Sequence, residues 1–140
     1  IPLQEIKEYS HIKNNYNTYN AYEWLKFLKL SVHVLILPNG DIIRCRKDEQ
    51  RAWHAKGFNV NTLGVEFLVP GIHDYSSYLE KIKTDWVSDE QYHAGVELVQ
   101  QWINKFGIEN VFRHSDVSPG RKLDPGDGFR WNWFSDQIKE

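Results

Sequence analysis

The sequence has a single cysteine and no methionine. With only Cys45 present, an intramolecular disulfide framework and a cysteine-based zinc cluster are both excluded. No apolar run approaches the ~20 residues that a membrane-spanning helix needs, and no signal-peptide pattern is visible. Because methionine is missing even at position 1, we expect that the natural start was trimmed to Ile1; the cellular compartment stays open.

The chain also lacks an excess of charge of either sign. Its 17 Lys and Arg residues nearly balance its 19 Asp and Glu residues, so the formal net charge is −2. A slightly acidic chain with dispersed basic residues argues against a nucleic-acid-binding protein. Hydrophobic residues make up 41% of the chain and aromatic residues 14%. We therefore expect residues 1–140 to form one globular domain around a single core.

Strand-like and helix-like patterns alternate along the first half of the chain. A weak alternation predicts a strand over residues 3–12, and apolar spacing predicts a helix over residues 21–30. Residues 31–46 predict a hairpin that turns at Asn39-Gly40, and residues 62–69 predict a further strand.

The clearest helix signal covers residues 89–106. Ser88 and Gln91 have the spacing of a capping box, an apolar stripe follows, and Gly107 is placed to end the helix.

The remaining patterns complete the expected fold. Residues 70–87 look irregular and aromatic, residues 110–114 predict a short strand, and residues 128–140 predict a last helix. Strands that alternate with helices indicate a mixed α/β fold, with a central mixed β-sheet flanked by helices.

The segment "FRHSDVSPGRKLDPG", residues 112–126, combines residue types that few structural elements need. His114 ends the predicted strand, and Asp124 comes ten residues later, where Pro125 restricts its backbone to extended conformations. A loop of this length can fold back so that an imidazole and a carboxylate meet, as in a catalytic zinc site, with Lys122 as a nearby cation. The spacing alone also fits a capped surface loop held by a His–Asp hydrogen bond.

Glu66 lies within the apolar run of the predicted strand 62–69. A carboxylate in such a run is costly unless it is paired or functional. The residue pattern leaves two interpretations open, a satisfied buried acid and a general base with a tuned pKa.

Three blocks of the sequence together resemble the zinc N-acetylmuramoyl-L-alanine amidases. The blocks are "SVHVLILPNGDI", "AWHAKGFNVNTLGVEF" and "RHSDVSPGRKLDPG", and they occur in the order of that family. The superfamily includes phage lysozyme-type amidases, cytosolic peptidoglycan-recycling amidases and peptidoglycan-recognition proteins.

The resemblance implies a zinc site at strand ends in a surface groove. It implies that His114 and Asp124 bind Zn²⁺, and that His11, the only histidine before the predicted helix 21–30, is the third ligand. It further implies that Glu66 activates the water and that Lys122 stabilises the oxyanion.

Other residues have weaker assignments. His54 matches a recurring family histidine near the groove, and with Asn59 it is a candidate for substrate binding; each has a structural alternative. His33 alternates with its neighbours and is interpreted as a structural histidine hydrogen-bonded beneath the site. The aromatic segment 75–86, with Tyr78, either walls the groove or packs over the sheet edge.

The function that the resemblance implies is hydrolysis of the amide bond between N-acetylmuramic acid and L-alanine. The substrate is either peptidoglycan or a soluble muropeptide, so an endolysin, an autolysin and a recycling enzyme are all consistent with the sequence. The alternative is a peptidoglycan-binding recognition module without catalysis. We expect a monomeric, bacterial or phage-encoded protein, made in the cytoplasm and acting at the cell wall if it is lytic.

Overall fold

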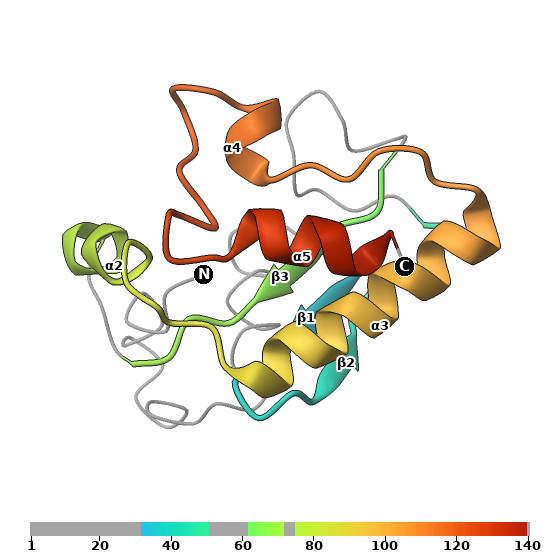
Figure 1. Ribbon diagram of the computed structural model, residues 1–140, viewed down its shortest axis with the longest axis horizontal. Helices are drawn as coiled ribbons and strands as arrows, with labels where there is room; N and C mark the ends of the chain where they lie inside the picture. Colours follow the sequence, from blue (N-terminus) through green and yellow to red (C-terminus); the bar gives the residue numbers. More distant parts are fainter. Residues whose placement is uncertain (1–31, 51–61, 72–74, 140) are drawn as a thin grey trace.

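The computed structural model of the protein describes residues 32–50, 62–71 and 75–139 (Figure 1). The strand and helix predicted before residue 31 lie outside these residues. In chain order the described elements are β1 (Val34–Ile36), β2 (Ile42–Arg44), β3 (Val65–Phe67), α2 (Tyr75–Lys81), α3 (Asp89–Phe106), α4 (His114–Val117) and α5 (Trp131–Ile138).

β1 and β2 form the antiparallel hairpin that the sequence predicts. Its turn is closed by two backbone hydrogen bonds, from Leu37 N to Asp41 O at 3.0 Å and from Gly40 N to Leu37 O at 2.8 Å. Gly40 has a φ of 89°, a left-handed conformation that glycine adopts without strain. Asn39-Gly40 is thus the turn of this hairpin.

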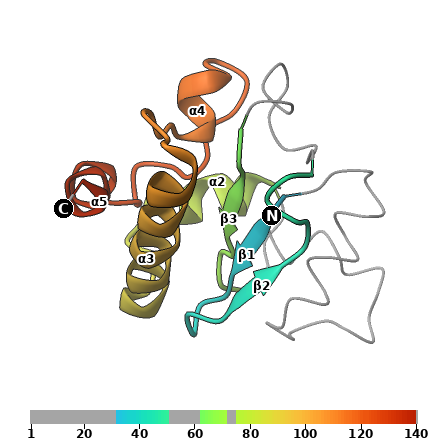
Figure 2. The same cartoon turned by 90° about the vertical axis from the view of Figure 1, so that its right-hand side faces the viewer.

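β3 pairs with β1 on the opposite side and runs parallel to it, so the strand order is β2-β1-β3. In this register Glu66 lies opposite Leu35. The described sheet is therefore mixed, as the sequence predicts. α3 lies against one of its faces, and α5 packs beside α3, with Phe134 also in contact with Phe67 of β3 (Figure 1 and Figure 2).

The two ends of α3 confirm the signals read from the sequence. Ser88 Oγ accepts a hydrogen bond from Gln91 N at 3.0 Å, and Gln91 Oε1 accepts one from Ser88 N at 3.1 Å. This capping box satisfies amide groups that the first turn of a helix otherwise leaves without partners. At the other end Gly107, with a φ of 63°, donates its N–H to Ile103 O and ends the helix.

Gln91 also joins α3 to the sheet. Its side-chain amide is fully buried and donates to the carbonyl oxygens of Ile36 at 3.1 Å and Leu68 at 3.0 Å. These two carbonyls lie at the ends of β1 and β3. The first turn of α3 is therefore fixed to both parallel strands.

β1 is buried on both faces. One face, with Val34 and Ile36, packs against α3 through Leu98 and Trp102. The opposite face belongs to a second apolar cluster, formed by Val32, Leu35, Leu37 and Leu68. Regular alternation would place Val32 and Val34 on one face; they lie in different clusters because the chain bends at His33 before the strand begins.

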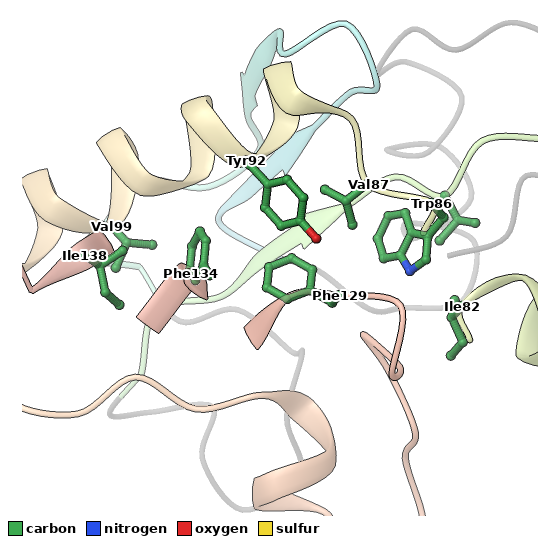
Figure 3. Packing of buried hydrophobic residues seen from close by; sticks show 9 residues of the cluster. Ile82, Trp86, Val87, Tyr92, Val99, Phe129, Phe134 and Ile138 are labelled. Atoms are coloured by element: carbon green, nitrogen blue, oxygen red, sulfur yellow. The ribbon is translucent and has the colours of Figure 1, made fainter. Parts of the chain in front are cut away.

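The largest apolar cluster lies among α3, α5 and β3 and is rich in aromatic side chains (Figure 3). Phe129 is the centre of this cluster: its ring centroid lies 5.2 Å from that of Phe67 and 5.3 Å from those of Tyr92 and Phe134. Burial of side chains of this size contributes about 1.5–3 kcal/mol each. Gly95 permits the close approach, because a Cβ there would lie 2.6 Å from Phe67 Cζ.

Residues 70–87 are more regular than the sequence predicts, because α2 occupies Tyr75–Lys81. Tyr78 and Leu79 on this helix pack against the cluster of Figure 3. Seven residues are too few to show a helical period in the sequence, which explains the missed element. No described helix has both the length and the apolar character needed to cross a bilayer.

Candidate active site

The turn that presents His114 is helical. The sequence predicts a strand over residues 110–114 followed by a loop. The strand prediction is wrong, and the loop begins with a helical turn, because α4 covers His114–Val117. The cause is local, because Asp116 accepts a hydrogen bond from Arg113 N at 3.0 Å and caps the turn from within.

The Arg113 side chain strengthens this arrangement. Its Nε and Nη2 reach the two oxygens of Asp116 at 3.1 and 3.0 Å, a bidentate pair. The hydrogen bond with Arg113 holds the pKa of Asp116 below its ordinary value. The guanidinium also lies over the Trp131 ring, 5.4 Å from its centroid. The start of α4 is thus fixed to the start of α5.

The chain after α4 folds back so that Asp124 meets His114, as the length of the segment predicts. Lys122 N donates to Ser118 O at 3.0 Å, which begins the return, and Ser115 N donates to Asp124 O at 3.1 Å, which completes it. His114 Nδ1 then lies 3.0 Å from Asp124 Oδ2.

This pair is polarised by its surroundings. Burial raises the pKa of the Asp124 carboxyl group. The hydrogen bond with His114 and the charge of that imidazole are the main effects that lower it, and the net pKa is below its ordinary value. The carboxylate is therefore the favoured form, which is the form that binds a metal. His114 Nε2 is buried and has no hydrogen-bond partner in the part of the chain that the structure describes.

The pair fits two positions of a zinc site. Zinc ligands lie about 2.0–2.2 Å from the ion, so two ligands at a tetrahedral angle lie about 3.3–3.6 Å apart. His114 Nδ1 and Asp124 Oδ2, 3.0 Å apart, would have to separate by only a few tenths of an ångström to bind one ion. Within residues 32–50, 62–71 and 75–139, no group of three His, Cys, Asp or Glu side chains is arranged to hold a metal ion. His11, the predicted third ligand, lies outside the described residues.

A cleft of about 760 Å³ contains the pair. Glu66, from the middle of β3, lines the same cleft as His114 and Asp124 and is half-buried. Lys122, also half-buried, is not among the described residues that line it. The structure therefore brings Glu66, His114 and Asp124 to one cleft. Lys122 lies two positions before Asp124 in the chain but does not line the cleft.

The remaining substrate candidates have different outcomes. His54 and Asn59 lie outside the described residues. Tyr78 and Trp86, from the aromatic segment 75–86, both line the cleft. The indole Nε1 of Trp86 also donates to the carbonyl oxygen of Pro125 at 3.3 Å, so this wall contacts the residue that follows Asp124. The prediction that the segment walls the groove fits these positions, although its side chains also pack on the core.

Two residues that line the cleft, Arg113 and Trp131, were not predicted from the sequence. Arg113 and Asp116 stand three residues apart around His114, a spacing that signals a capped turn. Trp131, which stacks under Arg113, is eighteen positions away, and no local pattern predicts that contact.

Comparison with known proteins gives the relationship of the chain. A family model described as N-acetylmuramoyl-L-alanine amidase matches residues 5–127. The 1,6-anhydro-N-acetylmuramyl-L-alanine amidase AmpD of Enterobacter cloacae is 33% identical over 113 residues, which cover 76% of this chain and 56% of the relative. The chain thus spans little more than half the length of this curated relative.

Solved structures agree with that relationship. A crystal structure of a selenomethionine derivative of AmpD superposes with a TM-score of 0.66 and 26% identity, covering 89% of this chain and 68% of that one. A complex of the amidase AmiD from E. coli with the substrate anhydro-N-acetylmuramic acid-L-Ala-D-gamma-Glu-L-Lys superposes with a TM-score of 0.62 and 25% identity, covering 77% and 48%. Because the family model matches most of its length, the chain belongs to the N-acetylmuramoyl-L-alanine amidase family.

Proposed function

We propose that the protein is a zinc-dependent amidase that hydrolyses the bond between the lactyl carbonyl of N-acetylmuramic acid and the nitrogen of L-alanine. The observation that carries the proposal is the meeting of His114, Asp124 and Glu66 in one cleft. An imidazole and a carboxylate in contact supply metal ligands, and a separate carboxylate supplies a base.

His114 and Asp124, with His11 as the third ligand, would hold the zinc ion. A zinc ion in such a site makes a water molecule acidic enough to attack near neutral pH and polarises the amide carbonyl. Two imidazoles and one carboxylate with an open position are a ligand set that catalytic zinc sites use.

Glu66 is the proposed general base. It takes a proton from the attacking water and delivers a proton to the alanine nitrogen, so that the C–N bond breaks and a free amine leaves. Its place in the centre of the short strand β3, paired with β1, gives the carboxylate a rigid backbone support. Placement of this kind is needed because a proton is transferred only over hydrogen-bond distances.

Lys122 is the proposed cation for the oxyanion. It stands two positions before Asp124, in a return held by its own N–H to Ser118 O at 3.0 Å. Loss of one such oxyanion donor typically lowers turnover about 10²–10³-fold.

The proposed substrate is a soluble muropeptide. Two observations support it over the polymer: the E. cloacae relative is named for the 1,6-anhydro sugar, and the AmiD complex contains an anhydro-muropeptide. Such fragments arise during turnover of peptidoglycan, so this substrate corresponds to a recycling enzyme. Cleavage of the polymer would correspond to an endolysin or autolysin.

The test is mass spectrometry of the products formed from anhydro-muropeptides and from purified peptidoglycan, with zinc-loaded protein and with a chelator. Metal-dependent release of peptides with a free L-alanine amino terminus is the expected result. Release from the soluble fragment alone supports recycling, and release from the polymer supports lysis. If folded, zinc-loaded protein releases nothing from either, the catalytic proposal is wrong and the non-catalytic recognition module takes its place.

A further inference from the structure

His33, which lies immediately before β1, uses both nitrogens of its ring. The side chain is fully buried. Its Nδ1 accepts a hydrogen bond from Gly64 N at 3.0 Å, and its Nε2 lies 2.7 Å from Gln50 O. A carbonyl oxygen only accepts hydrogen bonds, so Nε2 carries the proton and Nδ1 does not. The contacts therefore fix one neutral tautomer.

These two hydrogen bonds join separate walls of the cleft. Gln50 and Gly64 both line it, in the segments 48–50 and 62–67. The ring of His33 lies between them and packs edge-on against Trp102 of α3, with ring centroids 6.5 Å apart. One side chain thus sets the spacing of two wall segments.

The contact with Gly64 extends the pairing of β3 toward the catalytic carboxylate. β3 pairs with β1 over three residues only, and Glu66 is its central residue. Just before the strand, His33 N donates to Gly64 O at 3.0 Å while His33 Nδ1 accepts from Gly64 N. Without the ring, the buried N–H of Gly64 would lose this partner two residues before Glu66, and a buried unsatisfied donor favours a local shift.

We propose that His33 is a positioning residue for the reaction: it holds Gly64, and through β3 the carboxylate of Glu66, at the reacting end of the cleft. This inference rests on the proposed amidase function. His33 touches no substrate and acts only through the backbone that it holds.

Two substitutions separate the two hydrogen bonds. In His33→Gln the amide nitrogen replaces Nε2 and keeps the bond to Gln50 O, while the bond from Gly64 N is lost. In His33→Asn the amide oxygen replaces Nδ1 and keeps the bond from Gly64 N, while the bond to Gln50 O is lost. Each variant removes one hydrogen bond, and His33→Asn, which is one methylene shorter than His33→Gln, leaves the larger cavity, so a smaller loss of kcat in His33→Asn cannot come from packing.

The experiment measures kcat and KM for an anhydro-muropeptide, together with Tm and zinc content. We expect His33→Gln to lower kcat about 10- to 100-fold, because small misplacements of a catalytic group cost this much, with KM changed by less than about 3-fold. His33→Asn should lower kcat several-fold less than His33→Gln. Amide exchange of Gly64, followed by NMR, should accelerate in His33→Gln and not in His33→Asn.

A core substitution serves as the stability control. Ile138→Val on α5 lies in the core and outside the lining of the cleft, and it should lower Tm without lowering kcat. The proposal is wrong if His33→Gln retains the wild-type kcat, or if both His33 variants lose kcat only in proportion to the folded fraction. Wild-type protein that fails to cleave any muropeptide overturns the proposed function itself, and the positioning role with it.

Discussion

The carboxylate of Asp48 accepts a hydrogen bond from the indole Nε1 of Trp102 over 3.2 Å. Asp48 follows β2 in the chain and is largely buried, whereas Trp102 lies on the last half of α3. Arg44 also forms an ion pair with Asp48, and Lys105 Nζ lies 3.6 Å from it. The carboxylate therefore connects the hairpin to α3, next to Gln50, which lines the cleft.

This cluster predicts an acid-dependent loss of stability. Burial raises the pKa of Asp48. The hydrogen bonds and charges of Arg44, Trp102 and Lys105 lower it by a larger amount, so the net pKa is below its ordinary value. The folded state thus holds the charged form more firmly than the unfolded state. Its stabilising contribution is complete above the pKa of the unfolded chain, about 3.9, and is lost as pH falls through the lower folded pKa.

The measurement is urea unfolding of Asp48→Asn between pH 7 and pH 3. At pH 7 the variant should lose about 1.5–3 kcal/mol, the usual value of hydrogen bonds to a charged group. Its free energy of unfolding should also depend less on pH below about 4. Asp136→Asn, at an exposed position of α5, is the matched control and should change neither quantity. Equal acid dependence of wild type and Asp48→Asn would contradict the prediction.

The buried amide of Gln91 predicts a larger stability effect. Gln91→Leu roughly keeps the volume of the side chain but removes the amide that donates to Ile36 O and Leu68 O. It also removes the acceptor for Ser88 N, which is half of the capping box. We expect a loss of about 2–4 kcal/mol, since two buried carbonyls each lose a hydrogen bond, although Ile36 O keeps the one from Leu68 N at 2.9 Å. The same substitution at the exposed Gln101 of α3 should lie within about 0.5 kcal/mol of wild type. Denaturant unfolding of the two variants gives the comparison.

The proposed roles of two carboxylates predict opposite behaviour toward zinc. Glu66→Gln should lower kcat about 10²–10⁴-fold, the usual contribution of a general base, while zinc affinity stays within a few-fold of wild type. Asp124→Asn should weaken zinc binding and turnover together, because a neutral amide is a poorer ligand than a carboxylate. Titration with a chelating dye reports affinity separately from activity. Loss of zinc from Glu66→Gln would argue that Glu66 is a ligand.

Tyr78 tests the aromatic wall of the cleft. Removing a half-buried ring that lines the cleft should raise KM for a muropeptide about 5- to 30-fold, which corresponds to roughly 1–2 kcal/mol of lost contact. Tyr78→Phe keeps the ring and should stay near wild type if packing carries the effect. Unchanged KM and kcat in Tyr78→Ala, at wild-type Tm, would show that the ring only packs against the core.

The features that the sequence predicted correctly have local causes. Ser88, Gln91 and Gly107 determine the two ends of α3 through neighbouring backbone groups alone. Asn39-Gly40 likewise determines the turn of the hairpin. The return from His114 to Asp124 was predictable because only ten residues separate them and hydrogen bonds within that segment close it.

The features that were missed depend on distant partners or on very short elements. Residues 110–114 have strand-like composition, but the described sheet offers them no neighbouring strand, and composition alone does not supply one. The contact of Arg113 with Trp131, like the two hydrogen bonds of His33, joins segments that only the folded chain brings together. The alternation of side chains predicted Val32 and Val34 on one face of the sheet. They lie on opposite faces because the chain bends at His33.

The hydrogen bonds of Gln91 have a consequence for how the native state opens. Fraying of the first turn of α3 breaks the capping box, and with it the bonds to Ile36 O and Leu68 O. The ends of the two parallel strands and the beginning of the helix should therefore open as one cooperative unit rather than fray separately. The strand that carries Glu66 therefore shares the opening free energy of the start of α3, which packs on the opposite face of the sheet from the Leu35 cluster. The lifetime of the proposed catalytic geometry would then be set by a helix start that does not line the cleft.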